Sequence, residues 1–273
     1  MIFNAEVSHL AKSIIPGARI TALRMTSTAQ SSHVGSSLSA IEILSSLYSL
    51  KKLTHEITGS DSVSVVFSKG HAAAGLYAVM HCLEYLTDSQ ITSFCDDGSL
   101  LYGHVSHLVS PAIELSTGSL GHGLPFGLGL AHAAKLNNNF DKRIYVVISD
   151  GECDEGTTWE SALIANQFKL DNLCVIIDRN YIQSLGNTEN VLKLEPLGKK
   201  WMSFGWKTVD IDGQDIDQII NSISEIDGPL CVIANTKKGA GVSFMEDQLA
   251  WHYKSPSIEE LSSAIQEIKS RHK

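Results

Sequence analysis

Oxygen-bearing side chains follow two apolar runs near the middle of the chain. Asp150 comes shortly after the run Ile144–Ile148, and Asn180, thirty positions later, follows the run Leu173–Ile177. Both runs have the length and β-branched composition of strands, and a helical pattern at Glu155–Leu170 separates them. In open α/β folds the carboxyl ends of parallel strands share one sheet edge, where ligands bind. Asp150, the Asn180 amide oxygen and a nearby backbone carbonyl therefore predict a hard-oxygen site for Mg²⁺ or Ca²⁺ carrying phosphate oxygens.

The rest of the chain alternates helical and strand patterns. Further strands are expected at Val63–Phe67, Trp206–Ile211 and Leu230–Asn235. The expected helices are Glu6–Gln30 (broken near Pro16–Gly17), Ser37–Leu50, His71–Leu86, Thr87–Phe94, Leu120–Leu136, Ile216–Ile226 and Ser257–Ser270. This alternation predicts an α/β fold, a doubly wound and mostly parallel sheet with helices on both faces. With neither a low-complexity linker nor an internal repeat, residues 1–273 are interpreted as a single domain.

Composition narrows the class of protein. The 273 residues are 43% hydrophobic and 19% charged, which is typical of a soluble globular protein. A net charge of −9 disfavours nucleic acid and anionic membranes as partners. No apolar run reaches the roughly 20 residues that span a bilayer, and the N-terminus lacks the apolar segment of a signal peptide. The five cysteines are scattered without a CxxC pair, so we expect reduced thiols and a cytoplasmic location.

Several turns between the expected elements combine glycine with histidine. They are Ser32–Gly35, Ser68–His71, Gly103–His104, Ser116–Gly123, Lys237–Gly241 and the pair Trp251–His252. Glycine lets backbone N–H groups approach a ligand closely, and turns that open helices present free donors to phosphate. Histidine can hydrogen-bond diphosphate oxygens or exchange protons near neutral pH. These turns are therefore candidates for binding an anionic ligand.

Each feature also has a purely structural interpretation. An isolated turn of this kind is common at strand ends, and it is the spacing to Asn180 that favours a metal. A lone histidine is more often a surface or satisfied core residue, and four are placed in that class: His55, His81, His107 and His132. The glycine-rich stretch Gly121–Leu130 fits close helix packing as well as ligand contact. Other structural assignments are Trp201 and Trp206 in the core, Glu155 as a first-turn acid, and Thr157–Glu160 as a capping box.

The residues Asp150–Glu160 (D-G-E-C-D-E-G-T-T-W-E) and Asp178–Gln183 (D-R-N-Y-I-Q) resemble the thiamine-diphosphate motif of the transketolase family. That motif opens with Gly-Asp-Gly and closes with Asn about thirty residues later. Ser149 stands where the family usually has glycine, and we expect a small adjustment of the turn with the metal retained. Other segments resemble the family in the same order: Ser32–Ser39 (Val34 for Pro), Ser68–His71, Gly103–His104, Thr117–Gly121 (Ser119 for Pro), Lys237–Gly241, and His252 (followed by Tyr253 in place of Gly). The resemblance extends from about His33 to His252.

The resemblance implies thiamine diphosphate and Mg²⁺ (or Ca²⁺) as cofactors. The metal ligands it implies are Asp150, Asn180 and the carbonyl of Ile182. The cofactor contacts it implies are His71, Gly118, Leu120, Gly151, Glu155, Asn180 and His252. Among the catalytic residues it implies, His33, His104 and His252 would exchange protons with substrate hydroxyls. Glu155 and Glu160 join the catalytic set as hydrogen-bonded carboxylates at a subunit interface, where burial would raise the pKa of at least one of them.

Transketolases carry a second domain for the pyrimidine ring, and this chain ends at Lys273 without one. The resemblance therefore implies the N-terminal subunit of a split transketolase, inactive alone and active in an α2β2 assembly with a C-terminal pyrimidine-domain subunit. The assembly would move a two-carbon ketol unit from a ketose (phosphate) donor to an aldose acceptor. The alternatives are a deoxyxylulose-phosphate-synthase-like enzyme, an E1α subunit, a carboligase of a specialised pathway, and a non-catalytic cofactor-binding subunit. Donor, acceptor and metal remain open.

Overall fold

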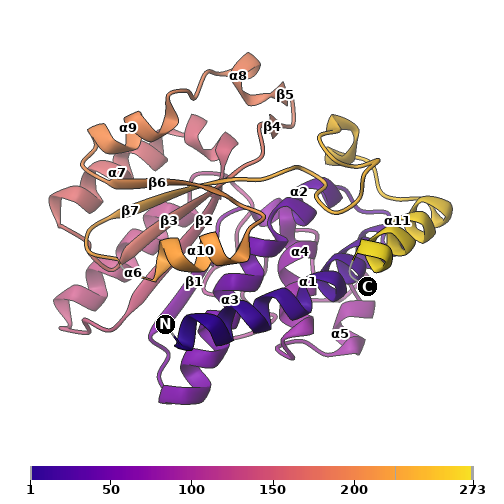
Figure 1. Cartoon of the computed structure of the whole chain (residues 1–273), viewed down its shortest axis with the longest axis horizontal. Helices are drawn as coiled ribbons and strands as arrows, with labels where there is room; N and C mark the ends of the chain where they lie inside the picture. The colour runs from indigo at the N-terminus through magenta and orange to yellow at the C-terminus, as the bar shows by residue number, and fades with distance from the viewer. Residues whose placement is uncertain (1, 225, 272–273) are drawn as a thin grey trace.

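A five-stranded sheet forms the centre of the molecule (Figure 1). The computed structural model describes residues 2–224 and 226–271. The strands lie in the order β1 (Val63–Phe67), β2 (Arg143–Ser149), β3 (Leu173–Arg179), β7 (Leu230–Asn235) and β6 (Lys207–Asp212). All neighbouring pairs in this sheet are parallel, which confirms the expected doubly wound α/β architecture. A small antiparallel hairpin, β4 (Ile182–Gln183) and β5 (Gly186–Asn187), was not expected from the sequence.

Helices connect and cover the strands. The α-helices are α1 (Ile2–Thr28), α2 (Val34–Ser39), α3 (Ile41–Thr58), α4 (Ala73–Cys82), α5 (Asp88–Thr92), α6 (Gly123–Leu136), α7 (Gly156–Gln167), α8 (Thr188–Val191), α9 (Leu197–Ser203), α10 (Ile216–Ile223) and α11 (Ile258–Arg271). Short 3₁₀ helices are found at η1 (Gly70–Ala72), η2 (Asp150–Asp154) and η3 (Leu249–His252). Within the described residues, no helix combines the length and the apolar character needed to cross a membrane.

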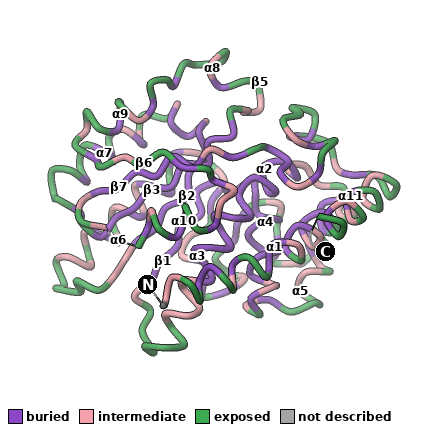
Figure 2. The backbone as a smooth tube through the Cα atoms, viewed as in Figure 1, coloured by how far each residue is buried: buried purple, intermediate pink, exposed green. Residues whose placement is uncertain are grey.

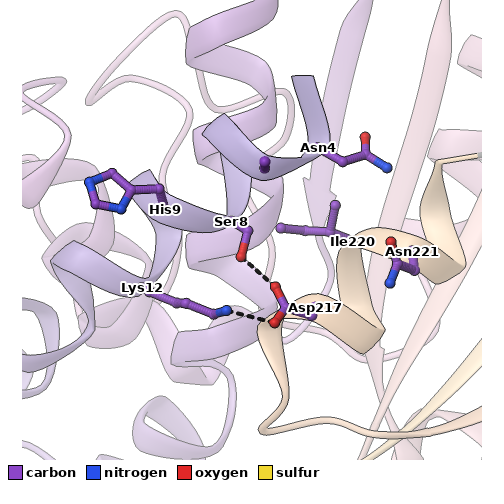
Figure 3. A pocket seen from close by; sticks show the side chains of 8 residues that line it. Asn4, Ser8, His9, Lys12, Asp217, Ile220 and Asn221 are labelled. Atoms are coloured by element: carbon purple, nitrogen blue, oxygen red, sulfur yellow. Dashed lines mark hydrogen bonds and ion pairs between the residues drawn. The ribbon is translucent and has the colours of Figure 1, made fainter. Parts of the chain in front are cut away.

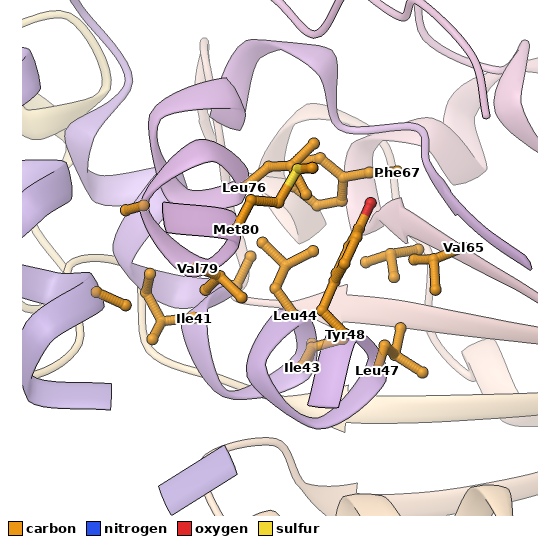
Figure 4. Packing of buried hydrophobic residues seen from close by; sticks show 14 of the residues in the cluster. Ile41, Ile43, Leu44, Leu47, Tyr48, Val65, Phe67, Leu76, Val79 and Met80 are labelled. Atoms are coloured by element: carbon orange, nitrogen blue, oxygen red, sulfur yellow. The ribbon is translucent and has the colours of Figure 1, made fainter. Parts of the chain in front are cut away.

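Alternate residues of each central strand enter two separate cores. In β2, Tyr145 and Val147 pack with α1, α3, α4 and α10, whereas Val146 packs with α6, α7 and α9. Figure 4 shows the first core between β1, α3 and α4, with the Tyr48 ring beside β1. The burial colouring of Figure 2 shows the central strands enclosed on both sides. Burial on both faces explains why these strands are continuous apolar runs and not alternating ones.

Several helix boundaries differ from the expectation. Helix α1 runs through Pro16 without a break, so the expected interruption at Pro16–Gly17 is wrong. Proline removes one helical hydrogen bond, but the packing of α1 against α3 and α4 outweighs this cost. The single helix expected at Ser37–Leu50 is divided at Ala40 into α2 and α3. Helix α10 ends at Ile223, short of Ile226, and position 225 lies outside the described residues.

The glycine-rich stretch is a site of close packing. A Cβ on Gly127 of α6 would lie 2.3 Å from Cγ2 of Val146 in β2, so glycine lets the helix approach the sheet. On the same side of the sheet, Trp201 and Trp206 are buried and their rings are 5.0 Å apart. Both structural expectations, close packing and core tryptophans, are confirmed.

Candidate active site

One pocket of about 230 Å³ lies at the carboxyl edge of the sheet. It is lined by residues that follow four strands: Lys69 and His71 after β1, Asp150 after β2, Asn180 after β3, and Lys238 after β7. The parallel register brings these strand ends level, with Ser149 opposite Asp178 and Asp178 opposite Ala234. The structure thus confirms that the two oxygen-bearing motifs share one edge.

A larger hollow of about 420 Å³ lies between α1 and α10 (Figure 3). Its charged groups satisfy one another, because Asp217 accepts hydrogen bonds from Ser8 and, at 2.6 Å, from Lys12. It lies away from the strand ends that carry the predicted residues. The smaller pocket at the sheet edge is therefore the candidate site.

Asp150 is buried in this pocket and is held from three directions. Its Oδ1 accepts a hydrogen bond from the Gly151 N–H at 2.9 Å. Its Oδ2 accepts from the Tyr181 N–H at 2.8 Å and from Arg179 Nη1 at 3.3 Å. Burial, together with the nearby Asp178 carboxylate, raises the pKa of Asp150, while Arg179 acts in the opposite direction. A divalent cation would relieve this cost by stabilising the charged form.

The other expected oxygen ligands line the same pocket. Asn180 is buried, and its Oδ1 accepts a hydrogen bond from the Ile182 N–H at 3.2 Å. The Ile182 carbonyl accepts from Lys238 Nζ at 2.8 Å. Among the described residues, no group of three or more His, Cys, Asp or Glu side chains could hold a metal ion. A cation bound here would therefore depend on mixed carboxylate, amide and carbonyl oxygens.

Four histidines that are far apart in the sequence form a cluster at this pocket. The His33 ring centroid lies 5.3 Å from that of His71, 6.1 Å from that of His104 and 4.9 Å from that of His252. The His33 backbone adopts φ 70°, a conformation that non-glycine residues rarely adopt, and its N–H donates to the His252 carbonyl at 2.9 Å. This contact couples the start of α2 to η3. The structure thus brings together all four histidines that the sequence singled out.

The imidazoles of His33, His71 and His252 are neutral at pH 7. Burial, helped by His104 and Lys238, lowers the pKa of His33 to about 4. Burial, helped by Lys238 and His33, lowers the pKa of His252 to about 3. Burial and the Lys69 ammonium lower the pKa of His71 well below its ordinary value. Neutral imidazole both donates and accepts hydrogen bonds, as recognition of hydroxyl groups requires.

Two buried lysines in the pocket were missed by the sequence reasoning. Lys69 Nζ forms an ion pair with Asp178, both side chains being fully buried. Lys238 Nζ contacts the Ile182 carbonyl and His252 Nδ1, the latter at 2.9 Å. Burial, with the Lys69 charge nearby, lowers the pKa of Lys238 to about 8. Both lysines lie in motifs noted for their glycine and histidine, Ser68–His71 and Lys237–Gly241, but lysine is usually a solvated surface residue.

A buried glutamate, Glu152, joins three loops beneath the pocket. Its carboxylate accepts hydrogen bonds from Ser68 Oγ, from the Ser149 N–H at 2.8 Å and from the Gly121 N–H at 3.1 Å. Burial raises its pKa. Ser149 and Glu152 form a capping box, while Thr157 Oγ1 donates to the Gly121 carbonyl, so the capping box expected at Thr157–Glu160 is wrong.

The loop that carries Gly118 and Leu120 lies against the end of β1. Thr117 Oγ1 donates to the Phe67 carbonyl at 2.8 Å, and a Cβ on Gly70 would lie 2.2 Å from the Thr117 carbonyl oxygen. Gly118, Leu120 and Gly151 all line the pocket, as expected for cofactor contacts. His104 stands at its edge and is exposed.

Glu155 and Glu160 lie apart from the pocket lining and are exposed in this chain. The expected burial at a subunit interface is not present within the single chain, and this role stays a prediction.

The four histidines that were given a structural interpretation have ordinary surroundings. His81 pairs with Asp88, His107 with Ser116, the His132 ring lies 4.4 Å from that of Phe168, and His55 pairs with Asp61 at the surface.

Comparison with known proteins agrees with this geometry. The family model "Transketolase, thiamine diphosphate binding domain" matches residues 10–264. The chain belongs to this family. Ketol transfer with thiamine diphosphate is the activity of the family, and its members are transferases. The expected family membership and cofactor class are therefore confirmed.

The relatives fall into two size classes. The A subunit of the apulose-4-phosphate transketolase of Actinobacillus succinogenes is 40% identical over 242 residues, 87% of each chain. The protein of the same name from Phocaeicola vulgatus is 37% identical over 249 residues, 89% of this chain and 88% of that one. Human transketolase is 31% identical over 93% of this chain but only 41% of its own length. The chain thus matches most of the length of these A subunits and about two fifths of the human transketolase.

A solved structure shows the same fold. Transketolase from Leishmania mexicana superposes with a TM-score of 0.81 at 24% identity, over 95% of this chain and 41% of that one. The match confirms that the α/β unit described above has the fold of the thiamine diphosphate binding domain of transketolases.

Proposed function

We propose that this chain, as one domain, is the diphosphate-binding subunit of a two-chain transketolase. A separate chain would supply the pyrimidine-binding half, and together they would move a two-carbon ketol unit between a ketose (phosphate) donor and an aldose acceptor. The observation that carries the proposal is a single pocket that combines the oxygen set of Asp150 with two buried lysines and the histidine cluster. Cationic and oxygen-donor groups of this kind fit a metal-bound diphosphate.

The oxygen atoms of the pocket fit a hard divalent cation. Asp150 Oδ1 and Asn180 Oδ1 each accept one hydrogen bond, so each retains a lone pair. The Ile182 carbonyl accepts from Lys238, and a carbonyl oxygen has a second lone pair. Mg²⁺ and Ca²⁺ both bind carboxylate, amide and carbonyl oxygens. We therefore assign Asp150, Asn180 and the Ile182 carbonyl as metal ligands.

The chain's own residues supply binding and proton exchange. Thiamine diphosphate, when bound, supplies the carbon nucleophile that breaks and forms the carbon–carbon bonds. Asn180, His71, Lys238 and the backbone of Gly151 line the pocket and would hold the diphosphate, while Lys69 pairs with Asp178. Gly118, Leu120 and Glu155 are further assigned cofactor contacts.

Three histidines are assigned to the substrate. His33, His104 and His252 would hydrogen-bond its hydroxyl groups, with His252 also touching the cofactor. Because the pKa values of His33 and His252 are low, both imidazoles are neutral at pH 7, and each has a ring nitrogen that can accept a hydrogen bond from a substrate hydroxyl.

The assembly proposed is an α2β2 tetramer in the cytoplasm. Glu155 and Glu160 stand at the start of α7 with exposed side chains, as contact with another chain requires. We assign them to that interface. The five cysteines are all free thiols, which agrees with a reducing compartment.

The test is reconstitution with the partner chain. The chain is purified alone, with its pyrimidine-half partner, and with a partner lacking the pyrimidine-ring glutamate; size exclusion gives the assembly. Because two relatives of matching length are named for apulose 4-phosphate, this ketose phosphate is the first donor to assay, with xylulose 5-phosphate as comparison. Ketol transfer is expected only from the complete pair. Transfer by this chain alone, or cofactor binding without turnover on any donor, would contradict the proposal.

A further inference from the structure

Arg179 is buried directly behind the proposed metal corner, and none of the roles above uses it. It is the last residue of β3 and immediately precedes Asn180. Its side chain is fully buried, and its guanidinium lies 4.2 Å from the centre of the Tyr181 ring. An arginine this deeply buried needs several acceptors to offset the loss of water.

Its acceptors come from two places. On one side, Nη1 donates to Asp150 Oδ2 at 3.3 Å. On the other side, the guanidinium donates to Thr188 Oγ1 at 2.7 Å, Glu189 Oε1 at 2.7 Å and Glu195 Oε1 at 3.1 Å. These last three residues belong to the segment that contains α8 and projects beyond the sheet in Figure 1. The planar fork of arginine suits simultaneous contacts of this kind, which a lysine ammonium reproduces poorly.

The hydrogen bonds at Asp150 divide its two oxygens into different roles. Oδ2 accepts from both Arg179 and the Tyr181 N–H, which fills its two lone pairs. Oδ1 accepts only from the Gly151 N–H and keeps one lone pair for a ligand. The carboxylate is thus arranged to give a cation one oxygen and not two.

We propose that Arg179 is a positioning residue that restricts Asp150 to one-oxygen ligation and so favours Mg²⁺ over Ca²⁺. Mg²⁺ requires near-ideal octahedral geometry with single-oxygen ligands, whereas Ca²⁺ accepts more ligands and often takes both oxygens of one carboxylate. Removing the guanidinium would free a lone pair on Oδ2 and allow two-oxygen ligation. The inference rests on the proposed function, because it assumes a cation at Asp150.

The test measures the ratio of the dissociation constants for Ca²⁺ and Mg²⁺. A general loss of packing would weaken the binding of both cations and would not by itself shift this ratio towards Ca²⁺. Dissociation constants for Mg²⁺ and for Ca²⁺ are measured by calorimetry on the full-length chain together with its partner subunit at saturating thiamine diphosphate. In Arg179→Gln, the ratio of the Ca²⁺ constant to the Mg²⁺ constant is expected to fall about tenfold, the size of one charge-assisted contact. Arg179→Lys keeps a positive charge if the glutamine variant does not fold, and a smaller fall in the same ratio is expected.

Glu195→Gln is the matched control. It alters an acceptor of the same guanidinium but leaves the contact with Asp150 in place, so the ratio is expected to stay at the wild-type value. A folded Arg179→Gln or Arg179→Lys chain with the wild-type ratio would overturn this inference and leave the proposed function unaffected. If the wild-type chain together with its partner subunit shows no cation-dependent binding of thiamine diphosphate, the proposed function fails first and the inference with it.

Discussion

Removing the Lys69 ammonium should strongly lower the free energy of unfolding of the cofactor-free chain. Lys69 and Asp178 form an ion pair in which both side chains are 0% exposed. Lys69→Met keeps the length of the side chain and leaves Asp178 buried without its counter-ion. Breaking a buried pair in this way costs about 3–5 kcal/mol.

The structure places the cost near the lower limit of that range. Asp178 keeps two hydroxyl donors, Ser39 Oγ at 2.7 Å and Thr236 Oγ1, which continue to stabilise its charge. We therefore expect a loss of about 3 kcal/mol in the free energy of unfolding at pH 7. With an m value of about 3 kcal/mol/M, this moves the urea midpoint down by about 1 M.

The assay is urea unfolding of the cofactor-free chain, followed by circular dichroism. Asp178→Leu and the double variant Lys69→Met/Asp178→Leu complete a double-mutant cycle. Because the double variant removes both charges together, its loss should be well below the sum of the two single losses. Additive losses, or a Lys69→Met midpoint within about 0.3 M of the wild type, would show that the pair is not the source of stability.

Three further changes test other parts of the argument. Asp150→Ala should abolish metal-dependent binding of thiamine diphosphate in calorimetry, and unchanged affinity would remove Asp150 from the metal ligands. Gly127→Ala should lower the free energy of unfolding by about 1–3 kcal/mol, because its Cβ would lie 2.3 Å from Val146. Its control, Gly129→Ala, meets nothing within 4 Å and should raise stability by about 0.5–1 kcal/mol; equal effects would refute the packing argument. The pKa of His33, lowered by burial, His104 and Lys238 to about 4, lies below its unfolded value of about 6.5, so its contribution to stability is present above pH 6.5 and lost towards pH 4. His33→Asn should lack this loss, so its urea midpoint should approach that of the wild type between pH 7 and pH 5; a constant gap would contradict the low pKa.

The sheet was predictable because its strands carry their signal locally. The expected bounds of β1 and β7 agree with the structure, since a strand buried on both faces is a continuous apolar run. The hairpin β4–β5 was not predictable, because two-residue strands have no periodicity to detect. The continuity of α1 through Pro16 could not be predicted either, because it depends on packing against α3 and α4, elements distant in sequence.

The sequence predicted the oxygen-bearing and histidine side chains that the structure brings together at the pocket. It did not predict the buried side chains of Lys69 and Glu152. Asp150 and Asn180 were identified because each directly follows a strand, and that rule depends only on local pattern. Lys69 and Glu152 were missed because their burial results from several strand ends meeting in space. The Ser149–Glu152 spacing is a usable signal, since it fits a capping box, but Thr157–Glu160 fits the same pattern, and the spacing alone does not distinguish the two.

The two buried lysines of the pocket differ in whether a carboxylate of the protein neutralises their charge. The charge of Lys69 is balanced by Asp178 within the protein. Lys238 differs: within the described chain its ammonium has hydrogen-bond acceptors but no carboxylate within ion-pair distance. Burial and the Lys69 charge lower its pKa to about 8, which is the expected effect on a cation that lacks a counter-ion. A diphosphate in this pocket would supply that counter-ion.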